Sequence, residues 1–179
     1  PTVDRSRPGP YLCADFLVFE KIVYVGIGVD SMAAIDDPSV PRSANDEYGT
    51  EMLRRMLKPH GWEVKPLYFN TNLSYHLDCI MKPIERGLVA FPEGALWHGL
   101  PEEIKDWEVI YLTPEEQAMG AANALPIDYK KVVVQKGCTK FIKELEKRDF
   151  EVIELDYSTI WDITGSGIHC SVMHLWREF

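Results

Sequence analysis

Residues 122–155, ANALPIDYKKVVVQKGCTKFIKELEKRDFEVIEL, predict two strands, a helix and a third strand in succession. Short apolar runs predict strands at 122–127, 132–135 and 150–155, with a turn at Asp128-Tyr129 between the first two. The segment before the third strand has apolar residues spaced i, i+3, i+4 and i+7, which predicts a helix with one buried face. These residues are Cys138, Phe141, Ile142 and Leu145.

The same order of elements is predicted at the start of the chain. Strands are expected at 15–20 and 22–27, a helix begins near Ser43 and Asp46, and a strand follows at 62–69. The apolar stripe of this helix consists of Tyr48, Met52, Leu53, Met56 and Leu57.

A further copy lies between these two units. It has strands at 77–83 and 88–91 around a turn at 85–87, a short helix at about 101–106, and a strand at 108–112. The copies share a pattern but almost no sequence identity. A repeated unit favours a radial or stacked α/β architecture, with an ordinary mixed α/β sheet as the open alternative.

Composition limits the class of protein. The chain has 179 residues, 46% of them hydrophobic, which fits one domain or a large piece of one. Its net charge of −9 argues against nucleic acid and anionic membrane surfaces as partners. No apolar run approaches the roughly 20 residues of a membrane-spanning helix, and no signal peptide is visible. We therefore expect a cytoplasmic protein.

The cysteines do not follow a metal-binding or disulfide pattern. They stand at positions 13, 79, 138 and 170 without the Cys-x-x-Cys spacing of a structural zinc site. We expect reduced thiols, and no metal or cofactor. A zinc-binding domain would rest on residue types alone.

One cysteine follows a glycine-rich turn, in Gly165-Ser166-Gly167-Ile168-His169-Cys170-Ser171. Residues 170–177 predict a short strand, with Cys170 at its start and His169 pointing to the opposite face in a structural role. A cysteine presented in this way is a candidate nucleophile. The alternative is a small buried apolar residue, which is the expectation for Cys13, Cys79 and Cys138.

Polar side chains recur where the first strand of each repeat begins. Asp15, the pair His76 and Asp78, and Asn123 occupy these positions, and Cys170 begins the closing strand. In a radial fold such positions converge on one axis. The sequence thus predicts one site with a nucleophile, an acid/base, an orienting carboxylate and a cation-binding carboxylate.

These motifs resemble the guanidino-group-modifying (pentein) superfamily, over about residues 10–177. Within it the chain is most similar to glycine and inosamine-phosphate amidinotransferases, with arginine deiminase and dimethylarginine dimethylaminohydrolase more distant. The matching residues are Cys13-Ala14-Asp15-Phe16, Tyr75-His76-Leu77-Asp78, Pro83-Ile84-x-x-Gly87-Leu88-Val89, Asn123 and Gly165 to Cys170.

The resemblance implies a five-bladed α/β propeller in which each blade is a strand–strand–helix–strand unit. Residues 1–179 would form a single domain, or the C-terminal part of one, with the last three blades. The family's N-terminal units carry another guanidinium-binding acidic residue, which has no counterpart here. The chain is therefore expected to be a fragment, or to obtain its missing blades from another chain or as a homo-oligomer.

The resemblance also implies a role for each residue. Cys170 is the nucleophile, His76 the acid/base, Asp15 the carboxylate that orients His76, and Asp78 and Asn123 bind substrate. The implied reaction moves the amidino group of arginine to an amine acceptor through a covalent amidino-cysteine, without a cofactor.

Two alternatives stay open. The first is a guanidine hydrolase of the same fold, in which water replaces the amine; the segment Cys13 to Phe16 favours the transferase. The second is a non-catalytic fragment or partner. His60, His98 and His174 have no motif support.

Overall fold

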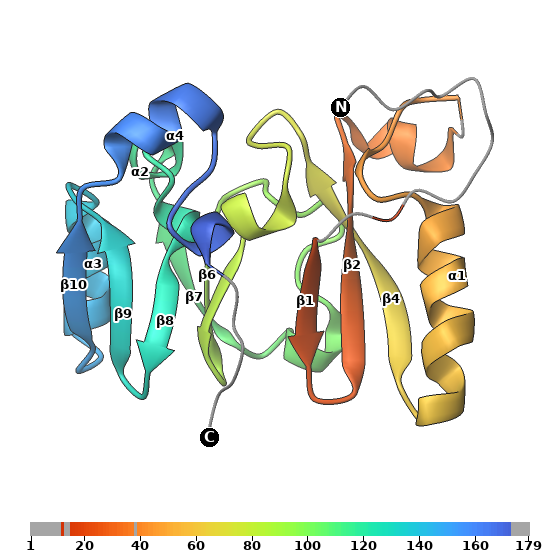
Figure 1. Ribbon diagram of the computed structural model, residues 1–179, viewed down its shortest axis with the longest axis horizontal. Helices are drawn as coiled ribbons and strands as arrows, with labels where there is room; N and C mark the ends of the chain where they lie inside the picture. The colour runs from red at the N-terminus through yellow and green to blue at the C-terminus, as the bar shows by residue number, and fades with distance from the viewer. Residues whose placement is uncertain (1–11, 13–14, 38, 173–179) are drawn as a thin grey trace. The chain divides into compact units, whose positions relative to one another are not determined.

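The computed structural model describes residues 12, 15–37 and 39–172, which form two compact units (Figure 1). The first unit extends to residue 77 and includes 96–98; the second comprises 78–95 and the chain from 99 onward. The expectations for Cys13 and His174, and for the strand beyond residue 172, lie outside the described residues. No helix in the described part of the chain is long and apolar enough to cross a bilayer.

The first unit contains a sheet with one long central strand. Strand β2 pairs antiparallel with β1 and β3, and parallel with β4. The strands are β1 (Phe16–Phe19), β2 (Ile22–Val29), β3 (Ser43–Ala44) and β4 (Glu63–Asn70), and the helical segments are η1 (Met32–Asp36), α1 (Glu47–Leu57) and η2 (Lys58–His60). The predicted order of strand, strand, helix and strand is therefore confirmed for this repeat.

Helix α1 begins one turn later than the sequence suggested. Asp46 caps it by accepting a hydrogen bond from the Gly49 N–H at 2.6 Å, whereas Ser43 lies in β3. After the 3₁₀ turn η2 the chain turns back at Gly61, which has a φ of 74° that suits glycine.

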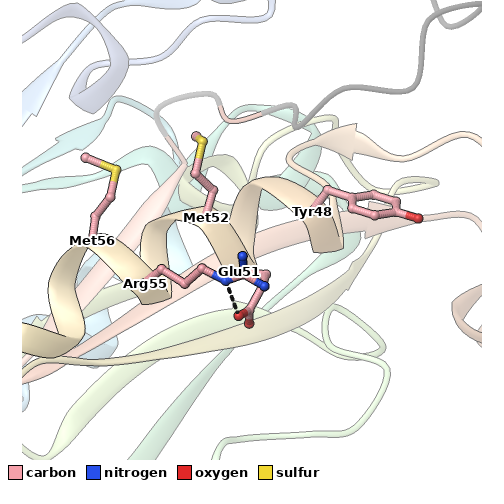
Figure 2. Close-up of a pocket in the computed structure, with 5 residues that line it drawn as sticks. All are labelled: Tyr48, Glu51, Met52, Arg55 and Met56. Atoms are coloured by element: carbon pink, nitrogen blue, oxygen red, sulfur yellow. Dashed lines mark hydrogen bonds and ion pairs between the residues drawn. The ribbon is translucent and has the colours of Figure 1, made fainter.

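The apolar stripe predicted for α1 is only partly buried. Leu53 and Leu57 pack against the valines of β2 and β4. Tyr48 and Met56 remain 77% and 61% exposed, because the small sheet covers only a narrow strip of the helix. Figure 2 shows Tyr48, Met52 and Met56 extending from α1 beside the Glu51–Arg55 ion pair. These five residues line an open groove of about 400 Å³.

The second unit contains two sheets with the same pairing scheme. In each, the middle strand is antiparallel to the strand before it and parallel to the strand after it. The sheets are β5 (Lys82–Glu85), β6 (Leu88–Pro92) and β7 (Glu108–Leu112), then β8 (Leu125–Asp128), β9 (Lys131–Gln135) and β10 (Glu151–Leu155). Both remaining copies of the repeat therefore form, and the α/β fold is confirmed. No closed sheet occurs among the described residues.

The helical segments of this unit differ partly from expectation. Only the 3₁₀ turn η4 (Glu102–Ile104) forms where a helix was predicted at about 101–106. Helix α3 (Thr139–Glu146) buries all four residues of its predicted stripe. Helices α2 (Pro114–Ala118) and α4 (Ser158–Thr164) were not predicted. Three short turns complete the unit: η3 (Leu77–Cys79), η5 (Ala121–Asn123) and η6 (His169–Ser171).

Three residues predicted at strand starts lie in short 3₁₀ turns instead. Asp78 lies in η3 before β5, and Asn123 lies in η5 before β8. Cys170 lies in η6, so it does not begin a strand as expected. Asp15 directly precedes β1, as predicted. These turns allow side chains to gather ahead of the strands without using the alternating geometry of a strand.

We predict that the core of the second unit depends on Phe141. This side chain is fully buried in the cluster formed by α3 and the two sheets. Phe141→Ala should lower the free energy of unfolding by about 3–5 kcal/mol, because it removes packed apolar area and leaves a cavity. The exposed Met56→Ala should change it by less than about 0.5 kcal/mol. Chemical denaturation measures both values, and equal losses would contradict this packing.

Candidate active site

Three of the predicted site residues meet in the second unit. The Asn123 Nδ2 atom lies 3.1 Å from Asp78 Oδ2 and 3.1 Å from Cys170 Sγ. The Cys170 Sγ atom lies 3.2 Å from the same Asp78 oxygen. The three turns η3, η5 and η6 thus place a thiol, a carboxylate and an amide in mutual contact, although these residues are far apart in the sequence.

Asn123 holds this arrangement from inside the unit. Its side chain is fully buried, and its Oδ1 atom accepts the backbone N–H of Cys170 at 3.1 Å. The Nδ2 atom also lies 3.2 Å from the backbone oxygen of Asp78. A buried amide satisfied by both neighbouring turns fixes their separation, because breaking either bond would leave a buried polar atom unpaired.

The glycine-rich turn fits closely against this amide. A Cβ atom on Gly167 would lie 2.5 Å from Asn123 Oδ1, which no side chain could tolerate without a shift of the turn. Gly165 has a different role, since it ends α4 with a φ of 67°. The two glycines therefore end a helix and bring the backbone of Cys170 into contact with Asn123.

His169 belongs to this cluster, contrary to the prediction that it points away. Its Nδ1 atom lies 3.2 Å from Asp78 Oδ2. The prediction was wrong because it assumed the alternation of a strand, whereas residues 169–171 form a 3₁₀ turn. Adjacency to Cys170 was the only signal of this contact in the sequence.

Cys79 is a second thiol beside Cys170. It is buried, as expected, but its Sγ atom lies 3.6 Å from Cys170 Sγ and 3.4 Å from Asn123 Nδ2. Its backbone oxygen accepts a hydrogen bond of 2.8 Å from the Gln117 side chain. Cys79 directly follows Asp78, which could have marked it as a neighbour of the site.

The Asp78 carboxyl group is held in its charged form. Burial raises its pKa, but hydrogen bonds from His169 and Cys170 and the positive charge of Lys82 outweigh burial, and the pKa lies well below its usual range. A partly buried carboxylate of this kind is suited to pairing with a cation.

The pKa values of the two thiols are shifted in opposite directions. The hydrogen bond between them lowers the pKa of Cys170, where the backbone N–H of Gly167 acts in the same direction; burial and the Asp78 charge oppose both. The same hydrogen bond, burial and the Asp78 charge raise the pKa of Cys79. Of the two thiols, Cys170 therefore loses its proton more easily, and Cys79 holds its proton more strongly.

The remaining two predicted residues form a pair in the first unit. Asp15 is buried, and its Oδ2 atom accepts the backbone N–H of Leu77 at 2.8 Å. The same oxygen lies 3.7 Å from the Nδ1 atom of the half-exposed His76, which is ion-pair distance but longer than a hydrogen bond. A Cβ atom on Gly26 would lie 2.8 Å from Leu77 Cβ, so glycine permits this close approach.

The second unit offers three possible metal ligands. Asp78, Cys79 and Cys170 place an oxygen and two sulfurs within 4.8 Å of one another. Structural zinc sites use four ligands and ionised thiols. Among the described residues this group supplies three ligands, one fewer than such a site uses.

Comparison with known proteins supports the amidinotransferase resemblance in sequence. No family model matches the chain. An L-arginine:L-lysine amidinotransferase from Pseudomonas savastanoi pv. phaseolicola is 25% identical over 147 residues, which cover 76% of this chain and 40% of that protein.

Solved structures of amidinotransferases and of a related hydrolase share the fold of this chain. An amidinotransferase of the saxitoxin biosynthetic pathway from Microseira wollei has a TM-score of 0.73 at 20% identity, over 93% of this chain and 47% of that one. The inosamine-phosphate amidinotransferase of Streptomyces griseus gives 0.71 at 20% identity, over 96% and 48%. A dimethylarginine dimethylaminohydrolase from Pseudomonas aeruginosa, solved with citrulline, gives 0.61 at 17% identity, over 83% and 49%.

The fold is therefore that of the guanidino-group-modifying enzymes. Within this class the chain resembles the amidinotransferases. It spans about half the length of these relatives.

We predict that two substitutions move the ionisation of Cys170 in opposite directions. Asp78→Asn removes a negative charge beside the sulfur, so the thiolate should form at lower pH. Cys79→Ala removes a hydrogen-bond donor, so the thiolate should form at higher pH. The measurement is the rate of Cys170 alkylation by iodoacetamide as a function of pH, followed by peptide mass. The same midpoint in both variants and in the unchanged protein would contradict these electrostatic assignments.

Proposed function

We propose that this chain carries the nucleophile and donor-binding part of an amidinotransferase that uses arginine. The observation that carries the proposal is the ionisable Cys170 thiol, held by Asn123 at 3.2 Å from the charged Asp78 carboxylate. A nucleophile beside a cation-binding group suits an attack on a cationic substrate. The resemblance to amidinotransferases supports this reading.

Donor binding would also activate the nucleophile. A planar guanidinium group can pair with the Asp78 carboxylate through two N–H groups. The Asp78 charge opposes ionisation of Cys170 in the absence of a cation. A bound guanidinium neutralises that charge and adds its own, so it favours the thiolate at the moment when the guanidinium carbon is presented to Sγ.

The proposed reaction proceeds in two halves. The Cys170 thiolate attacks the guanidinium carbon, the bond from carbon to the ornithine nitrogen breaks, and His76 gives the departing amine a proton. An amidino group remains on Cys170. The acceptor amine then loses a proton to His76 and attacks this carbon; the carbon–sulfur bond breaks and the thiolate is restored. No cofactor is needed for either half.

The roles of His76 and Asp15 in this reaction are part of the proposal. Asp15 lies 3.7 Å from the His76 ring and is proposed to orient it. Only Leu77 separates His76 from Asp78 in the sequence, and Asp15 holds the Leu77 backbone. The proposal that the acid/base and the donor-binding carboxylate serve one substrate rests on the amidinotransferase resemblance. Asn123 stays predicted as a substrate-binding residue, and its hydrogen bonds also support a role in positioning Cys170 and Asp78.

We further propose that the three repeats are the last three blades of a five-bladed α/β propeller. The shared pairing scheme of the three sheets supports this. On this view residues 1–179 belong to one amidinotransferase-like domain, and the other blades come from a longer protein, a second chain or a second copy. The cytoplasmic setting stays a prediction.

A guanidine hydrolase is the second candidate, because a dimethylarginine dimethylaminohydrolase shares the fold. Water would then attack the amidino-cysteine in place of an amine. The amidinotransferases have the higher fold similarity among the structures compared, at TM-scores of 0.73 and 0.71 against 0.61. This difference, together with the sequence match to an amidinotransferase, favours the transferase.

The complete protein, supplied with arginine, should release ornithine only when a primary amine is added. Cys170→Ser should reduce this release by a factor of roughly 10³ or more. Cys138→Ala, which alters a buried cysteine of the same unit, should retain activity and mainly affect packing.

Two results would contradict this assignment. Citrulline formed at an unchanged rate with or without amines would establish the hydrolase. Equal loss of activity in Cys170→Ser and Cys138→Ala, with both proteins folded, would remove Cys170 from its proposed role. Chromatographic measurement of ornithine and citrulline distinguishes these outcomes.

A further inference from the structure

We propose that Cys79 and Cys170 form a reversible disulfide when the protein meets hydrogen peroxide. The pair would be an oxidation site within the second unit, distinct from the role of Cys170 in amidino transfer. The bond itself follows from the geometry of two thiols, and only its effect on activity rests on the proposed function.

The two sulfurs are already in contact. Their separation is 3.6 Å, and a disulfide requires about 2.05 Å. Asn123 Nδ2 lies 3.1 Å from one sulfur and 3.4 Å from the other, so both sulfurs contact the same amide nitrogen. Cys170 lies on the short turn η6, whose residues are exposed or half-buried. Closure therefore needs a small shift of this turn and rotation of side chains, without disturbing a strand.

Solvent exposure and pKa indicate which of the two thiols reacts first with peroxide. Cys170 is exposed, whereas Cys79 is buried. The hydrogen bond from Cys79 lowers the pKa of Cys170, so Cys170 is the thiol that peroxide can reach and oxidise. Redox-sensitive cysteines share this arrangement of an accessible, easily ionised thiol beside a second thiol.

The chemistry is balanced with peroxide as the oxidant. The Cys170 thiolate attacks one peroxide oxygen, a sulfur–oxygen bond forms, the oxygen–oxygen bond breaks, and hydroxide leaves and gains a proton. Cys79 then attacks the sulfur of this sulfenic acid. The sulfur–sulfur bond forms, the sulfur–oxygen bond breaks, and the leaving hydroxide takes the Cys79 proton. Two thiols and one peroxide give one disulfide and two waters.

The first step prepares the second. The hydrogen bond to Cys170 is the largest cause of the raised pKa of Cys79, and the Cys170 charge adds to it. A neutral sulfenic acid on Cys170 removes that charge, so Cys79 loses its proton more easily. Contact between the reacting sulfurs favours this step over a second attack by peroxide, because the reaction within one molecule has a high effective concentration.

The disulfide would occupy the sulfur that attacks the guanidinium carbon. Oxidation would therefore stop amidino transfer, and a dithiol reductant would restore it. A buried partner thiol would also protect Cys170 from irreversible oxidation, since a disulfide can be reduced whereas sulfinic and sulfonic acids are largely permanent.

The test treats the reduced complete protein with hydrogen peroxide, blocks remaining thiols with N-ethylmaleimide, and maps peptides by mass without reduction. The main product should be a peptide pair joined through Cys79 and Cys170, lost on addition of dithiothreitol. Cys79→Ser should lose this product completely and accumulate sulfinic acid on Cys170. Cys138→Ala should keep it, since burial raises the pKa of Cys138 to about 12 and no oxidation is expected there.

Other products would overturn the proposal. Sulfinic acid on Cys170 in the unchanged protein, with Cys79 alkylated by the blocking reagent, would show that Cys79 does not react. A disulfide to Cys13 or Cys138 would show that the pairing is wrong. These readings come from peptide masses, so failure of the proposed amidinotransferase activity would leave them unaffected.

Discussion

The buried amide of Asn123 is the contact on which the second unit's site depends. It joins three short segments, η3, η5 and η6. Each of them is a single 3₁₀ turn. Its oxygen fixes the backbone of Cys170, and its nitrogen faces Asp78 and both sulfurs. The repeated strand order places η3 before β5 and η5 before β8. The fold therefore supplies the positions, and one amide sets the distances between the groups.

The electrostatics follow from this packing. A carboxylate placed next to a thiol would normally suppress its ionisation, yet the Cys79 hydrogen bond offsets this effect. A cationic substrate would remove the remaining opposition. The same closeness of two sulfurs that favours the Cys170 thiolate also exposes it to disulfide formation. The proposed reactivity and the proposed oxidation of Cys170 thus rest on the same contact between two sulfurs.

The sequence predicted the repeated strands well, because their short apolar runs and turns are local signals. It also predicted that Asp78, Asn123 and Cys170 lie close together, and the structure shows this contact. It did not predict the contact of His169 with Asp78, or the closeness of Cys79 to Cys170. Both contacts depend on 3₁₀ turns in segments that the sequence pattern had predicted to be strands. The exposure of Tyr48 and Met56 was likewise not visible in the helical periodicity, since it depends on how much of α1 the small sheet covers.

The most direct test of the central claim is to detect the carbon–sulfur bond on Cys170. The complete protein is mixed with arginine labelled with ¹³C at the guanidino carbon, without an acceptor, and is then quenched and digested. The account predicts one labelled amidino group on the Cys170 peptide, absent from Cys170→Ser and removed by a primary amine faster than by water. A labelled group on Cys13 or Cys79 instead, or arginine consumed with no labelled cysteine, would contradict it.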